Sequence, residues 1–470
     1  EKGRVVSQKS PHGRLTRFTY LPGAITVASD EDATRSNTWV SDASGHTIAI
    51  IDSDDHRQSM GYDAQGNLRS IRYRDGSHSV FSYDSRSLPT SITLPTGGRL
   101  TCEWDEYDRI SHVTTAEGAT CSYVYPDEVS RNPSCLVGPN GGVTRFTWVG
   151  GLLTKVTDPA GIRVEYGYND HGELVSARNA TGVVTRFDRD AAGRIIQVTT
   201  PMGHTHSFTY NEAGCLASHT DPEGATWRLE YDSTHRLVAA TDPAGALTRV
   251  GYDAAGGIAS ITDPLHRVLG QCCDDLGYPE SLRLPDGAQW SFVYDALGRL
   301  RQTTDPAGGT WRRRYSANGD LSVLIDPTGV SRHFISKPDQ ATTFSGSGTR
   351  ESIIDYDAYA RPVKITDAAG GTRIITYDTC GLPIELVDGE GGLTRIERDL
   401  AGRVIAIISP AGLRTTYGYD EAGHLAAITS PDGGRTRFSY DADSRLISRT
   451  DASGDEATYR YDRCGRLTRA

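Results

Sequence analysis

The chain has 470 residues and a net charge of −11 at neutral pH, from 49 Lys and Arg against 60 Asp and Glu. Its positive charges form no basic stripe, so we expect no nucleic-acid binding. No apolar run is long enough for a transmembrane helix or typical of a signal peptide, and the apolar content of 37% argues against a thick two-layer core.

A 21-residue repeat runs along the whole chain, and most repeats carry an aromatic residue followed by Asp and, three residues later, by Gly. A chain of this length ordinarily forms two or three domains. The unbroken period instead predicts one continuous repeat region over residues 1–470, with about 22 repeats. In chain order the aromatic position, which we call the anchor, is occupied by Tyr20, Ser41, Tyr62, Tyr83, Trp104, Tyr125, Trp148, Tyr168, Arg189, Tyr210, Tyr231, Tyr252, Cys273, Tyr294, Tyr315, a degenerate repeat near Ile335, Tyr356, Tyr377, Arg398, Tyr419, Tyr440 and Tyr461.

Each repeat contains two predicted turns. The segment after the anchor, the anchor turn, places its Gly where the backbone needs a positive φ. Asp108, His235, Ser87 and Ser444 take that position in some repeats, and we expect them to adopt the left-handed conformation. A second reversal, the midway turn, has the pattern Asp/Ser-Pro-x-Gly, in which Pro fixes φ at the first central position. It occurs at residues 158–161, 221–224, 242–245, 305–308, 326–329 and 409–412.

The two segments between the turns have the length of β-strands. In the strand that ends at the anchor, apolar and polar residues alternate, as in Trp227, Leu229 and Tyr231. One face of the sheet is therefore apolar or aromatic and the other is polar. In the returning strand the apolar residues lie three apart, as in Ile195 and Val198, which predicts a recurring β-bulge or a sharp local twist.

The number of strands restricts the architecture. About 44 antiparallel strands at roughly 4.8 Å spacing make a ribbon on the order of 200 Å wide. Open twisted sheets rarely exceed about ten strands, so we expect the ribbon to wind into a tube, spiral or shell with a thin wall. A propeller is the less favoured alternative, because it needs about eleven blades where four to eight are usual.

The pattern Tyr-Asp-x-x-Gly-Arg-Leu, seen in Tyr294–Leu300 and Tyr461–Leu467, followed by a strand and Asp-Pro-x-Gly, resembles the YD repeat of Rhs proteins. Insecticidal Tc-toxin C components and teneurins share this repeat, and the resemblance covers essentially the whole chain. It implies an all-β fold of two-stranded repeats, in which a long antiparallel ribbon winds into a hollow cocoon.

The resemblance also implies a function. Bacterial Rhs proteins enclose a C-terminal toxin domain, so we expect a non-enzymatic shell without cofactor or metal, made in the bacterial cytoplasm and delivered to target cells. Type VI secretion is the expected route. The expected partners are the enclosed toxin, a secretion spike protein and a chaperone bound through an N-terminal region, and an immunity protein. One alternative is an extracellular adhesion module that binds carbohydrate or protein, and another is an enzyme acting on polysaccharide.

Both ends of the chain fall inside a repeat. Residues 1–5 match the turn after an anchor, residues 10–13 match a midway turn, and Ala470 stands two positions before the next expected Asp-Pro. We therefore expect a fragment of a longer protein. In Rhs proteins an aspartyl self-cleavage region begins with Asp-Pro-x-Gly. Asp305 and Asp326 begin such a segment, but the residues that follow do not continue the pattern, so we expect no self-cleavage within this chain.

The remaining candidate residues have structural explanations. The turn Asp residues are expected to cap their own backbone rather than act as acid-base pairs. His204 and His206 lie on one face of a strand, but the sequence places no third ligand for a metal. We expect no catalytic, cofactor or metal site. The Cys residues, including Cys272 and Cys273, are expected to be reduced thiols, and the sequon at Asn179 lies in a turn. The Arg residues after the turn Gly, Arg194, Arg299, Arg403 and Arg466, are expected to pair with Asp or Glu on neighbouring repeats.

Overall fold

The computed structural model describes residues 3–11, 13–30, 35–345 and 351–470. Glu1, Lys2 and His12, which belong to the two turns predicted at the start of the chain, lie outside these residues. The described residues form 46 strands and no helix, so the prediction of an all-β chain is confirmed. Of these strands, 44 join one antiparallel sheet and the last two form a separate pair. Since the described residues contain no helix, none is present that spans a membrane.

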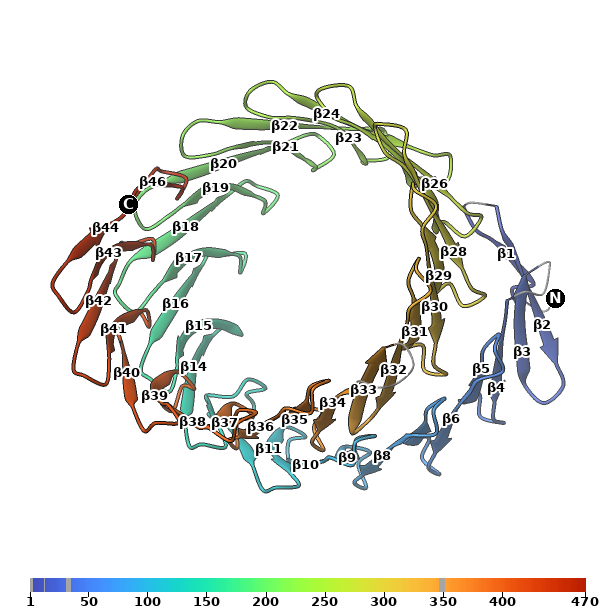
Figure 1. The fold of residues 1–470 in the computed structure, drawn as a ribbon, viewed down its shortest axis with the longest axis horizontal. Coiled ribbons are helices and arrows are strands. Elements are labelled where there is room, and N and C mark those ends of the chain that lie inside the picture. The colour runs from blue at the N-terminus through green and yellow to red at the C-terminus, as the bar shows by residue number, and fades with distance from the viewer. Residues whose placement is uncertain (1–2, 12, 31–34, 346–350) are drawn as a thin grey trace. The chain divides into compact units, whose positions relative to one another are not determined.

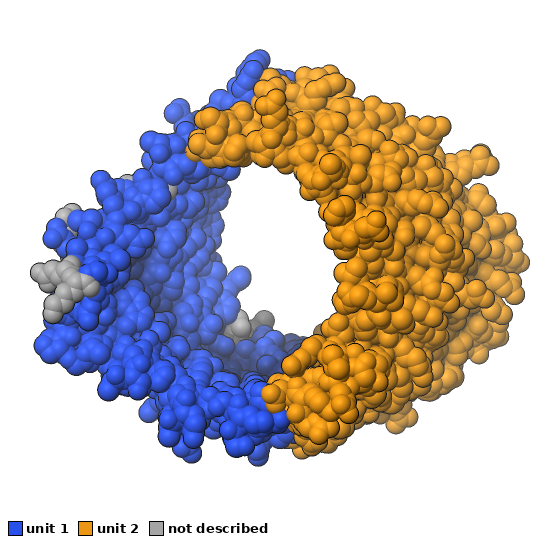
Figure 2. Space-filling model, turned by 180° about the vertical axis from the view of Figure 1, so that it is seen from behind, with its two compact units in different colours: residues 1–102, 248–372 blue, residues 103–247, 373–470 orange. Residues whose placement is uncertain are grey.

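The chain divides into two compact units, and each unit joins two stretches that are far apart in sequence (Figure 2). Unit 1 comprises residues 1–102 and 248–372, and unit 2 comprises residues 103–247 and 373–470. The division does not test the predicted single repeat region 1–470, which stays a prediction. Three strands lie at the limits of the units, namely β10 (Arg99–Trp104), β24 (Leu247–Tyr252) and β36 (Thr372–Tyr377).

In unit 1 the strands follow one another as hairpins along both stretches (Figure 1). The first stretch contains β1 (Ser7–Lys9), β2 (Leu15–Leu21), β3 (Ile25–Asp30), β4 (Ser36–Ser41), β5 (Thr47–Ile51), β6 (Arg57–Tyr62), β7 (Leu68–Arg72), β8 (His78–Tyr83) and β9 (Pro89–Thr93). The second contains β25 (Ile258–Thr262), β26 (Val268–Cys273), β27 (Pro279–Arg283), β28 (Gln289–Tyr294), β29 (Leu300–Thr304), β30 (Thr310–Tyr315), β31 (Leu321–Ile325), β32 (Ser331–Lys337), β33 (Gln340–Ser345), β34 (Glu351–Tyr356) and β35 (Pro362–Thr366).

Unit 2 is built in the same way. Its first stretch contains β11 (Ile110–Thr115), β12 (Thr120–Val124), β13 (Cys135–Val137), β14 (Val143–Val149), β15 (Leu152–Thr157), β16 (Arg163–Tyr168), β17 (Leu174–Arg178), β18 (Val184–Arg189), β19 (Ile195–Thr199), β20 (Thr205–Tyr210), β21 (Leu216–Thr220), β22 (Thr226–Tyr231) and β23 (Leu237–Thr241). Its second contains β37 (Pro383–Val387), β38 (Leu393–Arg398), β39 (Val404–Ile408), β40 (Arg414–Tyr419), β41 (Leu425–Thr429), β42 (Arg435–Tyr440), β43 (Leu446–Thr450), β44 (Glu456–Thr458), β45 (Arg460–Tyr461) and β46 (Leu467–Arg469).

The predicted bulge is confirmed in the returning strands. In the hairpin of β40 and β41, Gly418 pairs with Ala427 whereas the next residue, Tyr419, pairs with Leu425. Ala426 is therefore an extra residue without a partner, and the ladder shifts at this point. The same shift next to the anchor recurs in most of the hairpins. It explains why the apolar residues of the returning strand lie three apart.

The left-handed turn residues were also predicted correctly. Ser87, Asp108, His235 and Ser444 have φ of 64°, 59°, 66° and 65°. In both kinds of turn the first residue accepts a hydrogen bond from the backbone N–H of this left-handed residue, as in Gly193 N–H to the Asp190 carbonyl at 3.0 Å. The N–H of the first residue donates to the carbonyl of the residue that follows the left-handed residue. The turns thus share one geometry, a type I turn followed by a left-handed residue.

The sheet has almost no enclosed core. No large side chain of the described residues is fully buried, and the buried apolar residues are all Ala. The accessible surface of 27337 Å² is well above the roughly 17,000 Å² expected for a compact monomer of this mass. Most large apolar side chains are only partly buried, so hydrogen bonds between neighbouring strands and turns add to this partial burial in holding the fold.

The degenerate repeat near Ile335 is a plain hairpin. Strands β32 and β33 pair without a shift from Arg332–Ser345 to Lys337–Gln340. Pro338 and Asp339 form the connection, in place of an anchor turn.

Candidate functional site

The anchor side chain locks each repeat to the one before it. The hydroxyl of Tyr419 donates a hydrogen bond to the carbonyl of Val404, at 2.8 Å. Val404 is paired with the previous anchor, Arg398, where the ladder shifts. A carbonyl beside a bulge loses its regular ladder partner, and the Tyr hydroxyl supplies a replacement. The bulge and the anchor are therefore two parts of one device.

The same bond recurs along both units with a constant spacing of 15 residues. At three anchors that are not Tyr, namely Trp148, Arg189 and Arg398, another donor takes its place. Arg189 Nε donates to the Leu174 carbonyl at 3.0 Å, and Trp148 Nε1 donates to the Pro133 carbonyl at 2.9 Å. At these anchors the side chain thus keeps the role of hydrogen-bond donor. Tyrosines that make the bond are Tyr20, Tyr62, Tyr83, Tyr125, Tyr168, Tyr210, Tyr315, Tyr419, Tyr440 and Tyr461.

The Asp after the anchor caps its own turn, as predicted. Asp399 Oδ1 accepts the backbone N–H groups of Ala401 and Arg403, at 3.0 and 2.9 Å. Asp399 Oδ2 accepts from Arg403 Nε at 2.7 Å. The prediction that such Arg residues pair with neighbouring repeats was therefore wrong in its main part. Because the left-handed residue reverses the chain, the Arg lies over the Asp of its own turn, four residues earlier. The Arg therefore pairs with this Asp.

The Arg of the turn nevertheless reaches the next repeat in another way. The guanidinium carbon of Arg403 lies 4.6 Å from the ring centroid of Tyr419. Such a cation–π contact stabilises by about 0.5–1 kcal/mol at an exposed site. Arg194, Arg299 and Arg445 lie over Tyr210, Tyr315 and Tyr461 in the same manner. In these four repeats, Asp, Arg and Tyr thus join one repeat to the next.

The turns also stabilise the charged form of their Asp residues. The hydrogen bond from Arg194 is the largest cause that lowers the pKa of Asp190 below 3.8. The backbone N–H of Arg236 is the largest cause for the lowered pKa of Asp232. A carboxylate held by its own turn favours a structural role over proton transfer.

Turns of the two stretches meet within unit 1. Arg14 Nη1 donates to Asp275 Oδ2 at 3.1 Å, and Arg299 Nη2 donates to Asp54 Oδ2 at 2.9 Å. The partners are 243 to 265 residues apart, or about twelve repeats. In each case a midway turn or its neighbour in the first stretch faces an anchor turn in the second. We call this line of turn-to-turn contacts the seam of unit 1.

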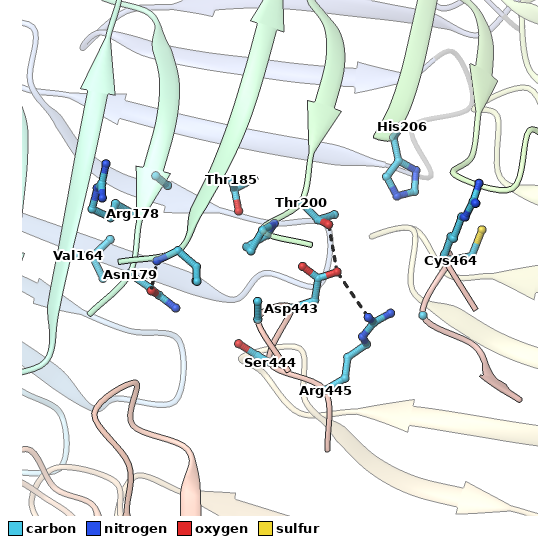
Figure 3. Close-up of a pocket in the computed structure, with 16 residues that line it drawn as sticks. Val164, Arg178, Asn179, Thr185, Thr200, His206, Asp443, Ser444, Arg445 and Cys464 are labelled. Atoms are coloured by element: carbon cyan, nitrogen blue, oxygen red, sulfur yellow. Dashed lines mark hydrogen bonds and ion pairs between the residues drawn. The ribbon is translucent and has the colours of Figure 1, made fainter. Parts of the chain in front are cut away.

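Unit 2 has an equivalent seam, centred on Asp443 (Figure 3). Asp443 Oδ2 accepts from Thr200 Oγ1 at 3.0 Å and lies 3.2 Å from His204 Nδ1, and Asp443 Oδ1 accepts from Met202 N at 3.0 Å. Arg445 lies 3.7 Å from the same carboxylate. Further along, Cys464 Sγ donates to Asp221 Oδ2 at 3.1 Å. An anchor turn of one stretch thus lies against a midway turn of the other stretch and bonds to its polar atoms.

A pocket of about 420 Å³ lies along the seam of unit 2 (Figure 3). It lies between the turns that contain Asn179 and Thr200 in one stretch and Ser444 and Cys464 in the other. Two charged groups that line it, Asp443 and Arg445, are already paired with each other and with neighbouring turn atoms. The pocket therefore presents no free acid-base pair to a ligand.

The apolar face carries a row of stacked rings in unit 2. His206 Nδ1 lies 3.1 Å from His219 Nε2, and the ring of His219 also stacks on Phe208 and Trp227, at centroid distances of 5.0 and 5.4 Å. His206 and His204, which the sequence placed on one strand face, thus have different partners. No group of three or more metal-ligating side chains occurs in the part of the chain that the structure describes.

The other candidate residues lie in turns or on the sheet. Asp305 Oδ1 and Asp326 Oδ1 each accept two backbone N–H groups of their own turn. Asn179 Oδ1 does the same. The eight Cys residues are free thiols, with Cys272 and Cys380 exposed. Burial raises the pKa of Cys102 and Cys121, which keeps these two thiols protonated and unreactive.

The sequence did not reveal the seam residues. Asp443, Thr200 and Asp221 follow the repeat pattern, so nothing in their own repeats distinguishes them from other turn residues. Their contacts depend on which distant repeats lie side by side. The local pattern does not contain that information.

Comparisons with known proteins agree with the repeat pattern. The family profile described as RHS Repeat matches residues 168–205, 210–247, 231–268, 274–310, 294–331, 398–436 and 440–470. The profile described as Teneurin YD-shell matches residues 38–133. No curated protein shows a significant sequence match.

Several solved structures share the fold. A crystal structure of TcdB2-TccC3 without its hypervariable C-terminal region matches 97% of this chain with a TM-score of 0.74 and 12% identity, and the match covers 35% of that chain. The crystal structure of TcdB2-TccC3 matches 96%, with a TM-score of 0.64 and 14% identity, and 30% of its length is covered. A Tc holotoxin pore of Photorhabdus luminescens matches 99%, with a TM-score of 0.51 and 13% identity, again over 30% of its length.

The chain therefore spans about a third of the solved chains it matches. At such low identity the likeness concerns the fold. Both family profiles nevertheless match the repeats, over residues 38–133 and over most of 168–331 and 398–470. The chain is an Rhs/YD-repeat protein.

Proposed function

We propose that this chain forms part of the wall of a shell in an Rhs polymorphic toxin. The shell encloses a toxin domain that lies C-terminal to this chain. The observation that carries the proposal is how the wall is joined. In many repeats the anchor, and in some also the Arg, holds one repeat to the next, and the two stretches of each unit meet along a seam of turns. A ribbon that winds on itself needs both kinds of contact.

The proposed wall is non-enzymatic. In the part of the chain that the structure describes, turn carboxylates such as Asp399 are occupied by backbone N–H groups and Arg, which leaves them poorly suited to proton transfer. Toxin activity and self-cleavage belong, in this proposal, to parts of the protein outside this chain.

The proposed route of delivery starts in a bacterial cytoplasm and uses type VI secretion. Eight free thiols suit folding in a reducing compartment. A spike protein and a chaperone, bound through an N-terminal region, and an immunity protein against the toxin are the partners that this route requires.

Protease protection of the toxin domain tests the proposal. The longer protein, with its C-terminal domain, is treated with a protease of broad specificity, and the C-terminal domain expressed alone serves as the control. Enclosure predicts that the domain survives in the longer protein and is cut once denaturant opens the shell. Digestion of both forms at the same rate would overturn the proposal.

Glycan and cell binding distinguishes the adhesion alternative. A shell has no need of a specific outer ligand. Specific cell binding by this chain, together with an unprotected C-terminal domain, would favour the adhesion module.

A further inference from the structure

The seam of unit 2 contains one of the two Met residues of the chain, Met202. Met202 is the third residue of the midway turn 200–203, and its backbone N–H donates to Asp443 Oδ1 at 3.0 Å. Its sulfur, Sδ, accepts a hydrogen bond from Arg445 Nη2 at 3.0 Å. Met202 therefore contacts two residues of the facing stretch, and Figure 3 shows both of them beside Thr200.

The Arg445 guanidinium is held at the Met202 sulfur by other residues of its own stretch. Arg445 Nε donates to Asp441 Oδ2 at 2.7 Å, and Arg445 Nη1 donates to the carbonyl of Asp462 at 3.3 Å. The guanidinium carbon also lies 5.2 Å from the ring centroid of Tyr461. At 3.0 Å, Nη2 and Sδ are in direct contact, so no further atom fits between them.

The Met202 side chain is open to reagents in solution. Met202 is 47% exposed. The other Met of the chain, Met60, is half-buried in β6, where Gln58 Nε2 lies 3.9 Å from its sulfur. Because an oxidant must reach the sulfur atom, we expect Met202 to react before Met60.

Hydrogen peroxide converts the thioether of Met into a sulfoxide. One peroxide oxygen forms a bond to the sulfur, the O–O bond breaks, and the other oxygen leaves as water. The sulfur loses an electron pair and is oxidised, and the peroxide gains that pair and is reduced. The side chain becomes polar and carries an additional oxygen, here on the atom that contacts Arg445.

The additional oxygen has to be accommodated where two turns already touch. Overfilling a packed contact forces the surrounding groups to shift. Since Arg445 is fixed to its own stretch, the shift falls on the midway turn 200–203, whose bonds to Asp443 then lengthen. We propose that Met202 is an oxidation site at which a peroxide loosens the seam of unit 2. Methionine sulfoxide reductases reverse this oxidation, so the loosening is reversible.

This inference goes beyond the proposed toxin enclosure and does not depend on it. A shell without cargo would still contain the Met202 contact. A shell whose seam does not respond to peroxide could still enclose a toxin.

Hydrogen exchange of the purified chain, before and after treatment with dilute hydrogen peroxide, tests the inference. Mass spectrometry of peptides locates the sulfoxide, and dithiothreitol then reduces any disulfides formed between thiols. We expect Met202 to be oxidised at least about threefold faster than Met60. Exchange should become at least about threefold faster in residues 200–204 and 441–445 and stay unchanged in 190–193. Methionine sulfoxide reductase should restore the exchange rates of the untreated chain.

The variants Met202→Leu and Met60→Leu form a matched pair, because each removes one sulfur at nearly constant volume. Both retain the eight free thiols, so oxidation of Cys affects them alike. Peroxide should accelerate exchange at the seam in Met60→Leu as in the parent, and should leave Met202→Leu unchanged. The inference is overturned if Met60 reacts as fast as Met202, if exchange of the oxidised parent is unchanged at the seam, or if Met202→Leu responds like the parent.

Discussion

The hydroxyl of Tyr419 donates to the backbone carbonyl of Val404, 15 residues earlier, at 2.8 Å. Val404 stands where the ladder of the preceding hairpin shifts by one residue. A bulge leaves a carbonyl without its ladder partner, and the next repeat provides the donor. Each repeat is therefore incomplete until its successor is in place, which makes neighbouring repeats cooperative.

Removing this hydroxyl should weaken the joint between two repeats. Tyr419→Phe keeps the ring beneath Arg403 and deletes the donor, which should cost about 1 kcal/mol. Native-state hydrogen exchange of β39 and β40 should then become roughly fivefold faster. Tyr417→Phe, in the same strand, is the control, because no described residue bonds the Tyr417 hydroxyl. Equal effects of the two substitutions would show that the anchor bond does not hold the joint.

The left-handed turn position should discriminate side chains by shape. His235 has φ of 66°, a conformation that β-branched residues avoid. His235→Val should lower the free energy of unfolding by about 1–2 kcal/mol, whereas His235→Asn should be close to neutral, since Asn tolerates this conformation. Chemical denaturation measures both. Equal stability of the Val and Asn variants would contradict the assigned backbone conformation.

Acid should loosen the turns below about pH 4. The pKa values of Asp190, Asp232 and Asp263 are lowered in the folded chain from 3.8. A lowered pKa means that the unfolded chain binds the proton more readily, so the contribution to stability is complete above the ordinary pKa. It is lost as the pH falls through 3.8 toward the folded value. Denaturation midpoints should therefore be constant from about pH 7 to 5 and fall below about pH 4.

Asp190→Asn isolates one of these carboxylates. Asn can still accept the backbone N–H groups, as Asn169 does, but it neither titrates nor pairs with Arg194. The variant should be less stable at neutral pH and should lose stability less steeply in acid. Asp188→Asn, on the exposed face of β18, should behave like the parent. An unchanged acid slope in Asp190→Asn would refute the assignment.

The seam of unit 2 should open on both sides when Asp443 is removed. Asp443→Ala deletes the acceptor for Thr200, Met202 and His204. Hydrogen exchange should accelerate in residues 200–204 as well as in 441–445, because the two turns hold each other. The turn at 190–193 should not change. Acceleration confined to 441–445 would mean that the seam contributes nothing to the first stretch.

Local periodicity was enough to predict strands, turns, the bulge and the left-handed residues. Each of these depends on neighbouring residues or on the next repeat, as with His235 and its turn. The partner of Arg403 was predicted wrongly, because strand pairing was given more weight than the turn that brings Arg403 back to Asp399. The seam and the pocket beside it were not predicted. They depend on contacts across about twelve repeats, such as Asp54 with Arg299, and the 21-residue pattern is the same on every repeat.

The central claim is that these repeats form the wall of a hollow shell. Small-angle scattering from the purified chain, supported by low-resolution imaging, tests it most directly. The account predicts a particle whose protein density lies at a distance from its centre, around a cavity filled with solvent. A compact solid particle without a central cavity would contradict it.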